Sequence, residues 1–480
     1  MAQFRSVPRI LRAFASLTAA ALTACSTAPK SSADARARVP PALAYETFDA
    51  VWTTIDTQHF DPTHNGVDWV AVREEFRPQL DSVRTDDELR ALLQQMIGRL
   101  GQSHFGIIPA HLANPDDMTG VASAASDTDE SSGGGDLGVT FRLVGNDILA
   151  IAPRIGGPAD EAGIRAGWRL LEVNGRDVRS ELMPDDAIDA PISAMLRYVT
   201  NQTAATRAIA APSETVRLVL DDDRGTRHEV SVTAVSFGGE IVKFGNLPPL
   251  ETHVTERTIT TPQLAAAGIP AAEADRLRVG YLAFNIWMVA AATGIDRAVD
   301  LHRTREALIV DLRGNPGGLG GMAMGVGGHF LDRDDSLGRM TSRDGAIEFR
   351  VNPRRVSADG RVVEPFKGML VILVDPLSAS TSEIFAGGLQ ELGRAVVVGE
   401  TSAGAALPSV AVELPNGDIL QHALADFVTP KGNRLEGRGV VPDLPVTLTR
   451  DSVSRESDPV LQAALRYIAH ERKRRVHSDG

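Results

Sequence analysis

A serine-rich turn carries the clearest chemical signal in this sequence. The run Ser378-Ala379-Ser380-Thr381-Ser382-Glu383 follows an apolar stretch from Met369 to Val374 and precedes a second apolar stretch with helical spacing. A serine on a strand-to-helix turn projects its hydroxyl from a rigid support, and the N–H groups at the helix start favour negative charge beside it. Such a hydroxyl can act as a nucleophile. A serine that only caps the helix would give the same local pattern.

The elements that would position this turn fall into several parts. Apolar residues recur at helical spacing from Tyr45 to Ile55, and Thr85 to Glu88 has the form of a capping box ahead of an apolar stripe that ends near Gly101. We therefore predict a helical domain over residues 43–111. Residues 112–135 are rich in Ala, Ser, Asp and Gly, and we expect them to form a flexible linker.

Short strands with turns follow over residues 136–237, and apolar strands then alternate with helices over residues 238–470. Apolar runs such as Ala307 to Leu312 suit strands that are covered on both faces. The chain ends in a basic segment, residues 471–480, which we interpret as a solvated helix end and tail. The pattern predicts a multidomain α/β protein with a helical domain first and a β domain in the middle.

The N-terminus has the features of a secretory signal. Three arginines precede an apolar run that is too short to cross a bilayer, and Leu22-Thr23-Ala24-Cys25 resembles the bacterial lipobox. We expect residues 1–24 to be removed, Cys25 to carry a lipid anchor, and residues 25–42 to form a linker. Ser26 resembles the outer-membrane sorting signal, which predicts an envelope protein of a bacterium, on the periplasmic face of the outer membrane. An ordinary signal that is cut elsewhere is the alternative.

Composition excludes several classes of function. The formal net charge of the 480 residues is −13, and loss of the signal's three arginines would make it about −16, which disfavours a nucleic-acid partner. Cys25 is the single cysteine, so the chain has no internal disulfide and no catalytic or zinc-binding cysteine elsewhere. No zinc-type spacing of His and Glu is present. We expect no metal and no organic cofactor.

Four motifs in order resemble the C-terminal-processing and tricorn-like serine peptidase family, and residues 136–237 resemble a bacterial PDZ domain. The motifs are Asp311-Leu312-Arg313-Gly314-Asn315-Pro316-Gly317-Gly318, the serine-rich turn, Gly393-Arg394-Ala395-Val396-Val397-Val398-Gly399-Glu400-Thr401, and Glu436-Gly437-Arg438-Gly439-Val440-Val441-Pro442-Asp443. The resemblance runs from about Tyr45 to the last helix. It implies a ClpP/crotonase-like α/β peptidase core over residues 238–470.

The resemblance places the nucleophile on Ser380. Members of the Ser-Lys branch carry a lysine after the glycine that corresponds to Gly404, but this chain has Ala405 there. That mechanism is excluded at this position. The supporting acid of the same branch falls on Glu391, which we expect to be a solvated helix residue.

The tricorn-like branch instead implies a histidine base and a late glutamate. Ser103-His104 matches its Ser-His pair, and Glu436 matches its acid. A carboxylate on the far ring nitrogen would fix the imidazole tautomer and stabilise the imidazolium that forms as Ser380 attacks. Ser103 is expected to add a hydrogen bond around the acid. A structural or surface role is the alternative for His104 and Glu436.

The oxyanion and the substrate end would be bound by backbone N–H groups. The turn with Gly317 and Gly318 and the N–H of Thr381 are the expected oxyanion donors, with Gly317 preferred of the two glycines. In the PDZ resemblance, the loop Leu137-Gly138-Val139 binds a peptide carboxylate.

These expectations combine into a lipid-anchored serine endopeptidase of the cell envelope that acts on protein or peptide substrates. Two alternatives remain open from the sequence: a catalytically silent protein of the same fold that binds peptides or ligands, and an esterase or amidase with the same triad. The sequence does not specify the oligomeric state.

Overall fold

The computed structural model describes residues 38–110, 135–178, 200–201, 210–236, 238–244, 247–456 and 458–478. The expected signal segment, Cys25 and all but the last residue of the expected linker at 112–135 lie outside these residues. Among the described helices, none combines the length and the apolar character that a membrane crossing requires.

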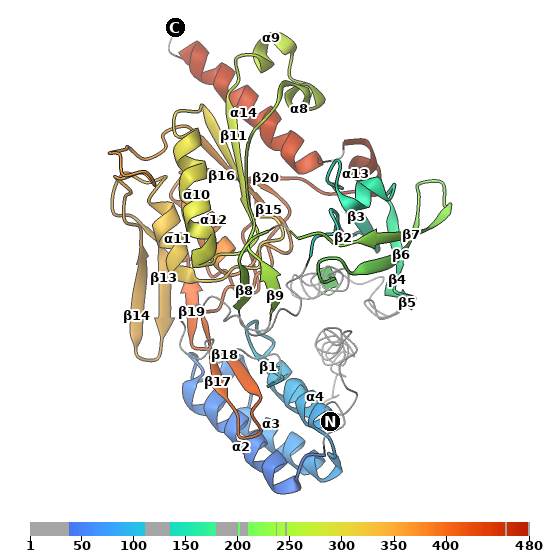
Figure 1. The fold of residues 1–480 in the computed structure, drawn as a ribbon. Helices are drawn as coiled ribbons and strands as arrows, with labels where there is room; N and C mark the ends of the chain where they lie inside the picture. The colour runs from blue at the N-terminus through green and yellow to red at the C-terminus, as the bar shows by residue number, and fades with distance from the viewer. Residues whose placement is uncertain are drawn as a thin grey trace, which may run out of the picture.

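A helical domain opens the described chain (Figure 1). Its elements are α2 (Pro41–Gln58), η2 (His64–Gly66), α3 (Trp69–Phe76), η3 (Arg77–Ser82), α4 (Asp86–Ile97), η4 (Gly98–Leu100) and β1 (Gly106–Ile108). The capping box predicted for α4 is present, because the Glu88 N–H donates to Thr85 Oγ1 and the Thr85 N–H donates to the Glu88 carboxylate.

The helical domain is completed by a hairpin from the C-terminal half of the chain. This hairpin consists of β17 (Ser409–Glu413) and β18 (Ile419–Ala423), and β18 pairs antiparallel with β1. Leu414 and Leu420 belong to the hydrophobic core that the helices build. Figure 1 shows the orange hairpin lying against the blue helices. The strand that follows Ser103 and His104 is therefore held by residues from far along the sequence.

The β domain contains a sheet of order β2-β3-β4-β6-β7, with β5 paired to β4. Its elements are β2 (Thr140–Val144), β3 (Asp147–Ile151), α5 (Pro158–Glu161), β4 (Arg169–Val173), β5 (Arg176–Asp177), β6 (Thr215–Asp221) and β7 (Arg227–Thr233). It has its own core, which includes Phe141, Ile164 and Leu218. The sheet agrees with the short strands predicted after residue 136.

The α/β domain is built on a sheet of order β10-β11-β12-β15-β16-β20, in which only the β10–β11 pair is antiparallel. Its strands are β10 (Val254–Thr258), β11 (Val279–Phe284), β12 (Ala307–Asp311), β15 (Met369–Val374), β16 (Ala395–Gly399) and β20 (Leu444–Pro445). Its helices are α8 (Thr261–Ala266), α9 (Ala271–Ala274), α10 (Val289–His302), α11 (Gly320–Gly327), α12 (Thr381–Glu391), α13 (Arg450–Glu456) and α14 (Pro459–Ser478). A hairpin, β8 (Ile241–Phe244) and β9 (Leu247–Glu251), precedes the sheet. A smaller sheet of order β14-β13-β19 is formed by β13 (Ser336–Ser342), β14 (Gly345–Arg350) and β19 (Ala425–Val428).

Helices cover both faces of the main sheet, as the apolar runs predicted. Alternate residues of β15 point to opposite faces, so that Leu370 and Ile372 join the core with α10, α11 and α12, while Val371 joins the core with α8 and α14. Figure 1 shows α14 across one side of the sheet and α10 to α12 on the other. The α14 helix extends to Ser478, so the basic residues that we expected in a tail lie largely on this helix.

Two arginines join the β domain to the α/β domain. Arg142 on β2 is buried and its Nε donates to Asp375 Oδ2 at 2.8 Å, just beyond the end of β15. Arg450 on α13 donates to the carbonyls of Gly167 and Asp222 at 3.0 and 2.7 Å. The β domain therefore contacts the strand that leads to the serine-rich turn.

Candidate active site

Ser380 occupies the turn between β15 and α12 as the N-cap of the helix, with φ 54° and ψ −116°. A non-glycine residue with positive φ is strained, and it persists only when its surroundings hold it. Here the Ser380 N–H donates both to the Ala405 carbonyl at 2.9 Å and to Glu383 Oε2 at 3.0 Å. The half-buried hydroxyl thus sits at a helix N-terminus on a sharply constrained turn, as a nucleophile requires.

The glycine turn after β12 packs directly on this serine. A Cβ built on Gly317, whose φ is 100°, would lie 2.6 Å from Ser380 Cβ and 3.1 Å from the Thr381 nitrogen. Thr381 Oγ1 donates to the Gly318 carbonyl at 2.8 Å, which ties the two segments together. Only a glycine leaves open the space beside Ser380 and the Thr381 N–H.

Asn315 sets the direction of this turn. Its Nδ2 donates to the Phe284 carbonyl at 2.8 Å, and its Oδ1 accepts the N–H of Gly317 at 3.0 Å. The Gly317 N–H is therefore already satisfied within the protein, whereas the structure gives no acceptor for the Gly318 N–H among the described residues. This changes the expected preference between the two glycines, because a donor engaged by Asn315 is less available to an oxyanion.

Ser103, His104 and Glu436 form a hydrogen-bonded network in which Ser103 and Glu436 are buried and His104 is half-buried. Ser103 Oγ lies 2.7 Å from His104 Nδ1 and 2.8 Å from Glu436 Oε2, and the Ser103 N–H donates to Glu436 Oε1 at 2.7 Å. The described contacts thus place the Ser103 hydroxyl between the imidazole and the carboxylate, where the sequence suggested that the carboxylate bonds to the ring itself. His104, like Ser380, has a positive φ, 59°.

Proton counting assigns the tautomer of His104. An ionised Glu436 accepts only, so the single hydroxyl proton of Ser103 goes to the carboxylate and Ser103 Oγ must accept from the imidazole. The ring proton is then on Nδ1, and Nε2 keeps a lone pair. Such an imidazole can accept a proton at Nε2.

A short segment connects the network with the serine. The Ala406 N–H donates to Glu436 Oε2 at 3.1 Å, while the preceding Ala405 accepts from the Ser380 N–H. The Gly437 N–H donates to the Gly404 carbonyl at 2.8 Å on the same segment. The structure therefore brings Ser380 and the Ser103–His104–Glu436 network to two sides of residues 404–406.

Burial controls the protonation of these groups. It lowers the pKa of His104 to about 4, so the imidazole is neutral at pH 7. Burial also raises the pKa of Glu436, against the opposing effect of the donors from Ser103 and Ala406. A neutral imidazole beside a carboxylate that accepts three hydrogen bonds has the protonation that a general base needs.

Ala405 occupies the position of the absent lysine. Its side chain is 2% exposed and packs with Ala379 and Ala403 in a small apolar cluster. No ammonium group can reach Ser380 from this position.

Glu391 differs from its expected role. It is half-buried, and it accepts the Lys431 N–H at 2.8 Å and an Nδ2 hydrogen of Asn433 at 2.7 Å. These donors lower its pKa, although burial opposes them. Glu391 thus holds a turn after β19 instead of lying free in solvent.

The predicted carboxylate-binding loop lies in the β domain, ahead of β2. Gly138 N–H donates to Asp136 Oδ1 at 2.7 Å, and the Leu137 carbonyl accepts the Ala159 N–H at 2.9 Å. Leu137 is buried, and Val139 is half-buried. The loop is formed, and whether it binds a peptide stays a prediction.

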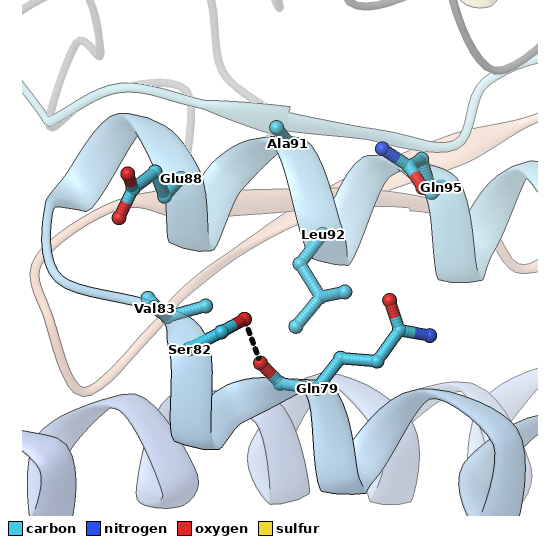
Figure 2. A pocket seen from close by; sticks show the side chains of 7 residues that line it. All are labelled: Gln79, Ser82, Val83, Glu88, Ala91, Leu92 and Gln95. Atoms are coloured by element: carbon cyan, nitrogen blue, oxygen red, sulfur yellow. Dashed lines mark hydrogen bonds between the residues drawn. The ribbon is translucent and has the colours of Figure 1, made fainter.

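The structure also shows a pocket in the helical domain, between η3 and α4. It has a volume of about 290 Å³ and is lined by Gln79, Ser82, Val83, Glu88, Ala91, Leu92 and Gln95 (Figure 2). None of the candidate catalytic residues lines it. Among the described residues, no cluster of three or more His, Cys, Asp or Glu side chains could hold a metal ion.

Sequence reasoning did not identify two residues that shape the site. Asn315 lies inside a motif that was interpreted through its glycines, and Glu383 was interpreted only as the end of the serine-rich run. An asparagine before a Pro-Gly-Gly turn and a glutamate at the third helix position are local signals, but their partners come from distant segments.

Comparison with protein families matches two parts of the chain. Residues 278–446 match "Peptidase family S41", and residues 40–98 match "Tricorn protease C1 domain". The first segment contains the serine-rich turn and Glu436, and the second is the helical domain up to α4.

Named relatives cover most of the chain. The carboxyl-terminal-processing peptidase 3, chloroplastic, of Arabidopsis thaliana is 26% identical over 424 residues, which are 86% of this chain and 72% of that protein. The carboxyl-terminal-processing protease of a Picosynechococcus strain is 26% identical over 396 residues, covering 82% and 80% of the two chains.

Solved structures share the fold. The photosystem II D1 C-terminal processing protease has a TM-score of 0.53 at 21% identity, covering 87% of this chain and 96% of its own. Mature CPAF has a TM-score of 0.55 at 15% identity, covering 92% and 98%. The multidomain α/β fold predicted from the sequence is confirmed.

Proposed function

We propose that the chain hydrolyses peptide bonds with Ser380 as nucleophile, His104 as general base and Glu436 as the supporting acid, since residues 278–446 match the peptidase family S41. The observation that carries this proposal is the Ser103–His104–Glu436 network, whose members come from two ends of the chain and fix an imidazole with a free Nε2. The alanine at position 405 supports the same choice, because the site then needs a base other than lysine.

In the proposed reaction, His104 Nε2 takes the proton of the Ser380 hydroxyl as the oxygen attacks the substrate carbonyl. The positive charge that develops on the imidazole is balanced by Glu436 through the Ser103 hydroxyl. The protonated His104 then gives its proton to the leaving amine, which leaves an acyl-enzyme on Ser380. Water, activated by the neutral imidazole, releases the acid product and restores the hydroxyl.

The oxyanion would be held by the N–H groups of Gly318 and Thr381. Thr381 is the first residue of α12, so its N–H has no acceptor within the helix. The Gly318 N–H has no acceptor among the described residues, while the Gly317 N–H is committed to Asn315. Both donors would act together with the positive end of the helix dipole.

The substrates are proteins or peptides, and we propose C-terminal tails as their recognised part, because the named relatives are C-terminal-processing enzymes. Residues 136–237 would act as a PDZ domain, with the loop of Leu137, Gly138 and Val139 binding the terminal carboxylate. Cys25 would anchor the mature protein by lipid at the outer membrane, on the periplasmic side. These three assignments continue the expectations from the sequence.

Covalent labelling by a fluorophosphonate probe tests the nucleophile and the base. We expect the soluble chain that begins after Cys25 to be labelled at Ser380, as mapped by mass spectrometry, and Ser380→Ala and His104→Ala to lose the label. His470→Ala removes an exposed histidine on α14 and serves as the control that keeps it. Labelling elsewhere, or undiminished labelling of His104→Ala, would overturn the assignment.

Peptide and ester substrates, compared on the same protein, then separate an endopeptidase from an esterase or amidase. A protein that is folded and unlabelled would point to a silent binding scaffold instead.

A further inference from the structure

Glu383 is a fully buried carboxylate beside Ser380 that the proposed reaction does not use. It is 0% exposed and lies at the third position of α12. Its Oε2 accepts the N–H groups of Ser380 at 3.0 Å and Ala405 at 2.9 Å. Its Oε1 accepts Ser402 Oγ at 2.6 Å and the Gly404 N–H at 2.8 Å. Four donors thus converge on one side chain.

A helix cap does not account for these contacts. Glu88, at the third position of α4, shows what capping alone requires: it is exposed and accepts only from the N–H groups of Arg84 and Thr85, which precede its helix. At Glu383, only the Ser380 N–H belongs to the turn before α12, and the other three donors lie on the segment after β16. Burying a carboxylate is costly, so these bonds must offset a large loss of hydration.

The segment that Glu383 holds is the one that leads to the base. Ser402, Gly404 and Ala405 donate to Glu383, and the next residue, Ala406, donates to Glu436. Glu383 and Glu436 thus accept the N–H groups of two adjacent residues, Ala405 and Ala406. Ser380 lies on the Glu383 side of this segment, and the His104 network lies on the Glu436 side.

We infer that Glu383 is a positioning residue for the proposed reaction, one that locks the strained Ser380 turn and the 402–405 segment together and so sets the nucleophile relative to the base. The inference rests on the proposed role of Ser380. Glu383 acts through the Ser380 backbone and does not touch the reacting atoms. In the ionised form it accepts all four donors, whereas a protonated carboxyl has a hydrogen where one donor must bind.

The ionisation of Glu383 gives the inference a measurable signature. Burial raises its pKa to about 7, against the lowering effect of its four donors. The nearest titratable groups across the 404–406 segment are Glu436, which burial also keeps at a raised pKa, and His104, with a pKa of about 4. We therefore expect the reactivity of Ser380 to rise as the pH passes upward through about 7, well above the titration of the base.

The experiment compares wild type, Glu383→Gln and Glu391→Gln across pH 5 to 9. Glutamine keeps the shape of the side chain but turns an NH2 group toward two of the four donors, so it cannot accept all four hydrogen bonds at any pH. We expect kcat and the rate of fluorophosphonate labelling to fall about 10- to 100-fold above pH 7, with KM changed little. The rise near pH 7 should disappear from the profile of this variant. Glu391→Gln, on the same helix and also holding two donors, should keep the wild-type profile.

The outcomes distinguish a failure of the proposed function from a failure of the role given to Glu383. A wild type that is not labelled at Ser380 would defeat the proposed function itself. A labelled wild type whose rate and pH profile are matched by Glu383→Gln would overturn only the role of Glu383. Should this variant fail to fold by circular dichroism, the wild-type profile decides, because a flat labelling rate between pH 6 and 8 contradicts the inference.

Discussion

Replacing Ser103 by alanine tests the central feature of the site, the hydroxyl between His104 and Glu436. The substitution removes one bond to a carboxylate at 2.8 Å and one to the imidazole at 2.7 Å. It leaves Glu436 with the N–H groups of Ser103 and Ala406, so the carboxylate stays bonded. In the proposed mechanism, the direct loss is therefore the link that stabilises the imidazolium and fixes the tautomer.

The magnitude follows from that link. A hydrogen bond to a charged group contributes about 1.5 to 3 kcal/mol. Because the imidazolium forms only during the reaction, this energy is lost mainly from the transition state, and each 1.4 kcal/mol or so lowers the rate tenfold. We expect kcat for Ser103→Ala to fall roughly 10- to 150-fold, with KM nearly unchanged.

The assay is steady-state hydrolysis of a peptide amide, together with the labelling rate of Ser380. Ser357→Ala is a matched control, because Ser357 is also a buried serine whose hydroxyl bonds to a carboxylate, that of Asp359. It lies in the loop between β14 and β15, away from the candidate site. If Ser103→Ala kept its kcat within about threefold of wild type, the relay would be refuted. An equal loss in the control would show a general effect of buried hydroxyls.

Three further predictions follow from the same contacts. Gly317→Ala puts a methyl group 2.6 Å from Ser380 Cβ, so we expect kcat to fall about 100-fold or more. The control Gly321→Ala on α11, where a Cβ meets only Met324 at 4.0 Å, should stay active. Equal kinetics for the two variants would contradict this prediction. Burial holds the pKa of His104 at about 4, below its unfolded value, so the unfolded state binds more protons between pH 6.5 and 4. In urea unfolding, wild type should lose about 3 kcal/mol relative to His104→Gln as pH falls from 7 to 4, and parallel curves would refute the shift. Arg142→Met leaves the Asp375 carboxylate buried without its cation, so we expect about 3 kcal/mol less stability and a lower kcat. A double-mutant cycle with Asp375→Asn measures the coupling between the two side chains. Losses of stability that simply add in this cycle would exclude that coupling.

Local signals explain what could be predicted from the sequence. The apolar runs of the parallel strands, the capping box of α4 and the serine at the start of α12 each depend on neighbouring residues, and the structure has all three. The α/β fold class and the serine peptidase family were predicted correctly. The role of each site residue stays a prediction that the labelling experiment addresses.

Contacts between distant segments explain what was missed. The Ser103 hydroxyl bridges to Glu436 only because β1 pairs with β18, and no local pattern shows that pairing. The Gly317 N–H turns to Asn315 because Asn315 is itself anchored on the end of β11. Glu391 is half-buried because the turn after β19 folds back onto α12. In each case the three-dimensional partner decides the role of a residue whose type was correctly noted.

The division of the site between domains has a consequence for folding. The core of the helical domain includes Leu414 and Leu420, so the strand that follows His104 is not covered until the C-terminal half of the chain has folded. Glu436 and the segment around Ala405 come from that same half. His104, Glu436 and Ser380 can therefore reach their mutual positions only in the completed fold. If His104 activates Ser380 as proposed, this arrangement would keep Ser380 unactivated in a partly folded chain, where a working peptidase site could damage the chain itself.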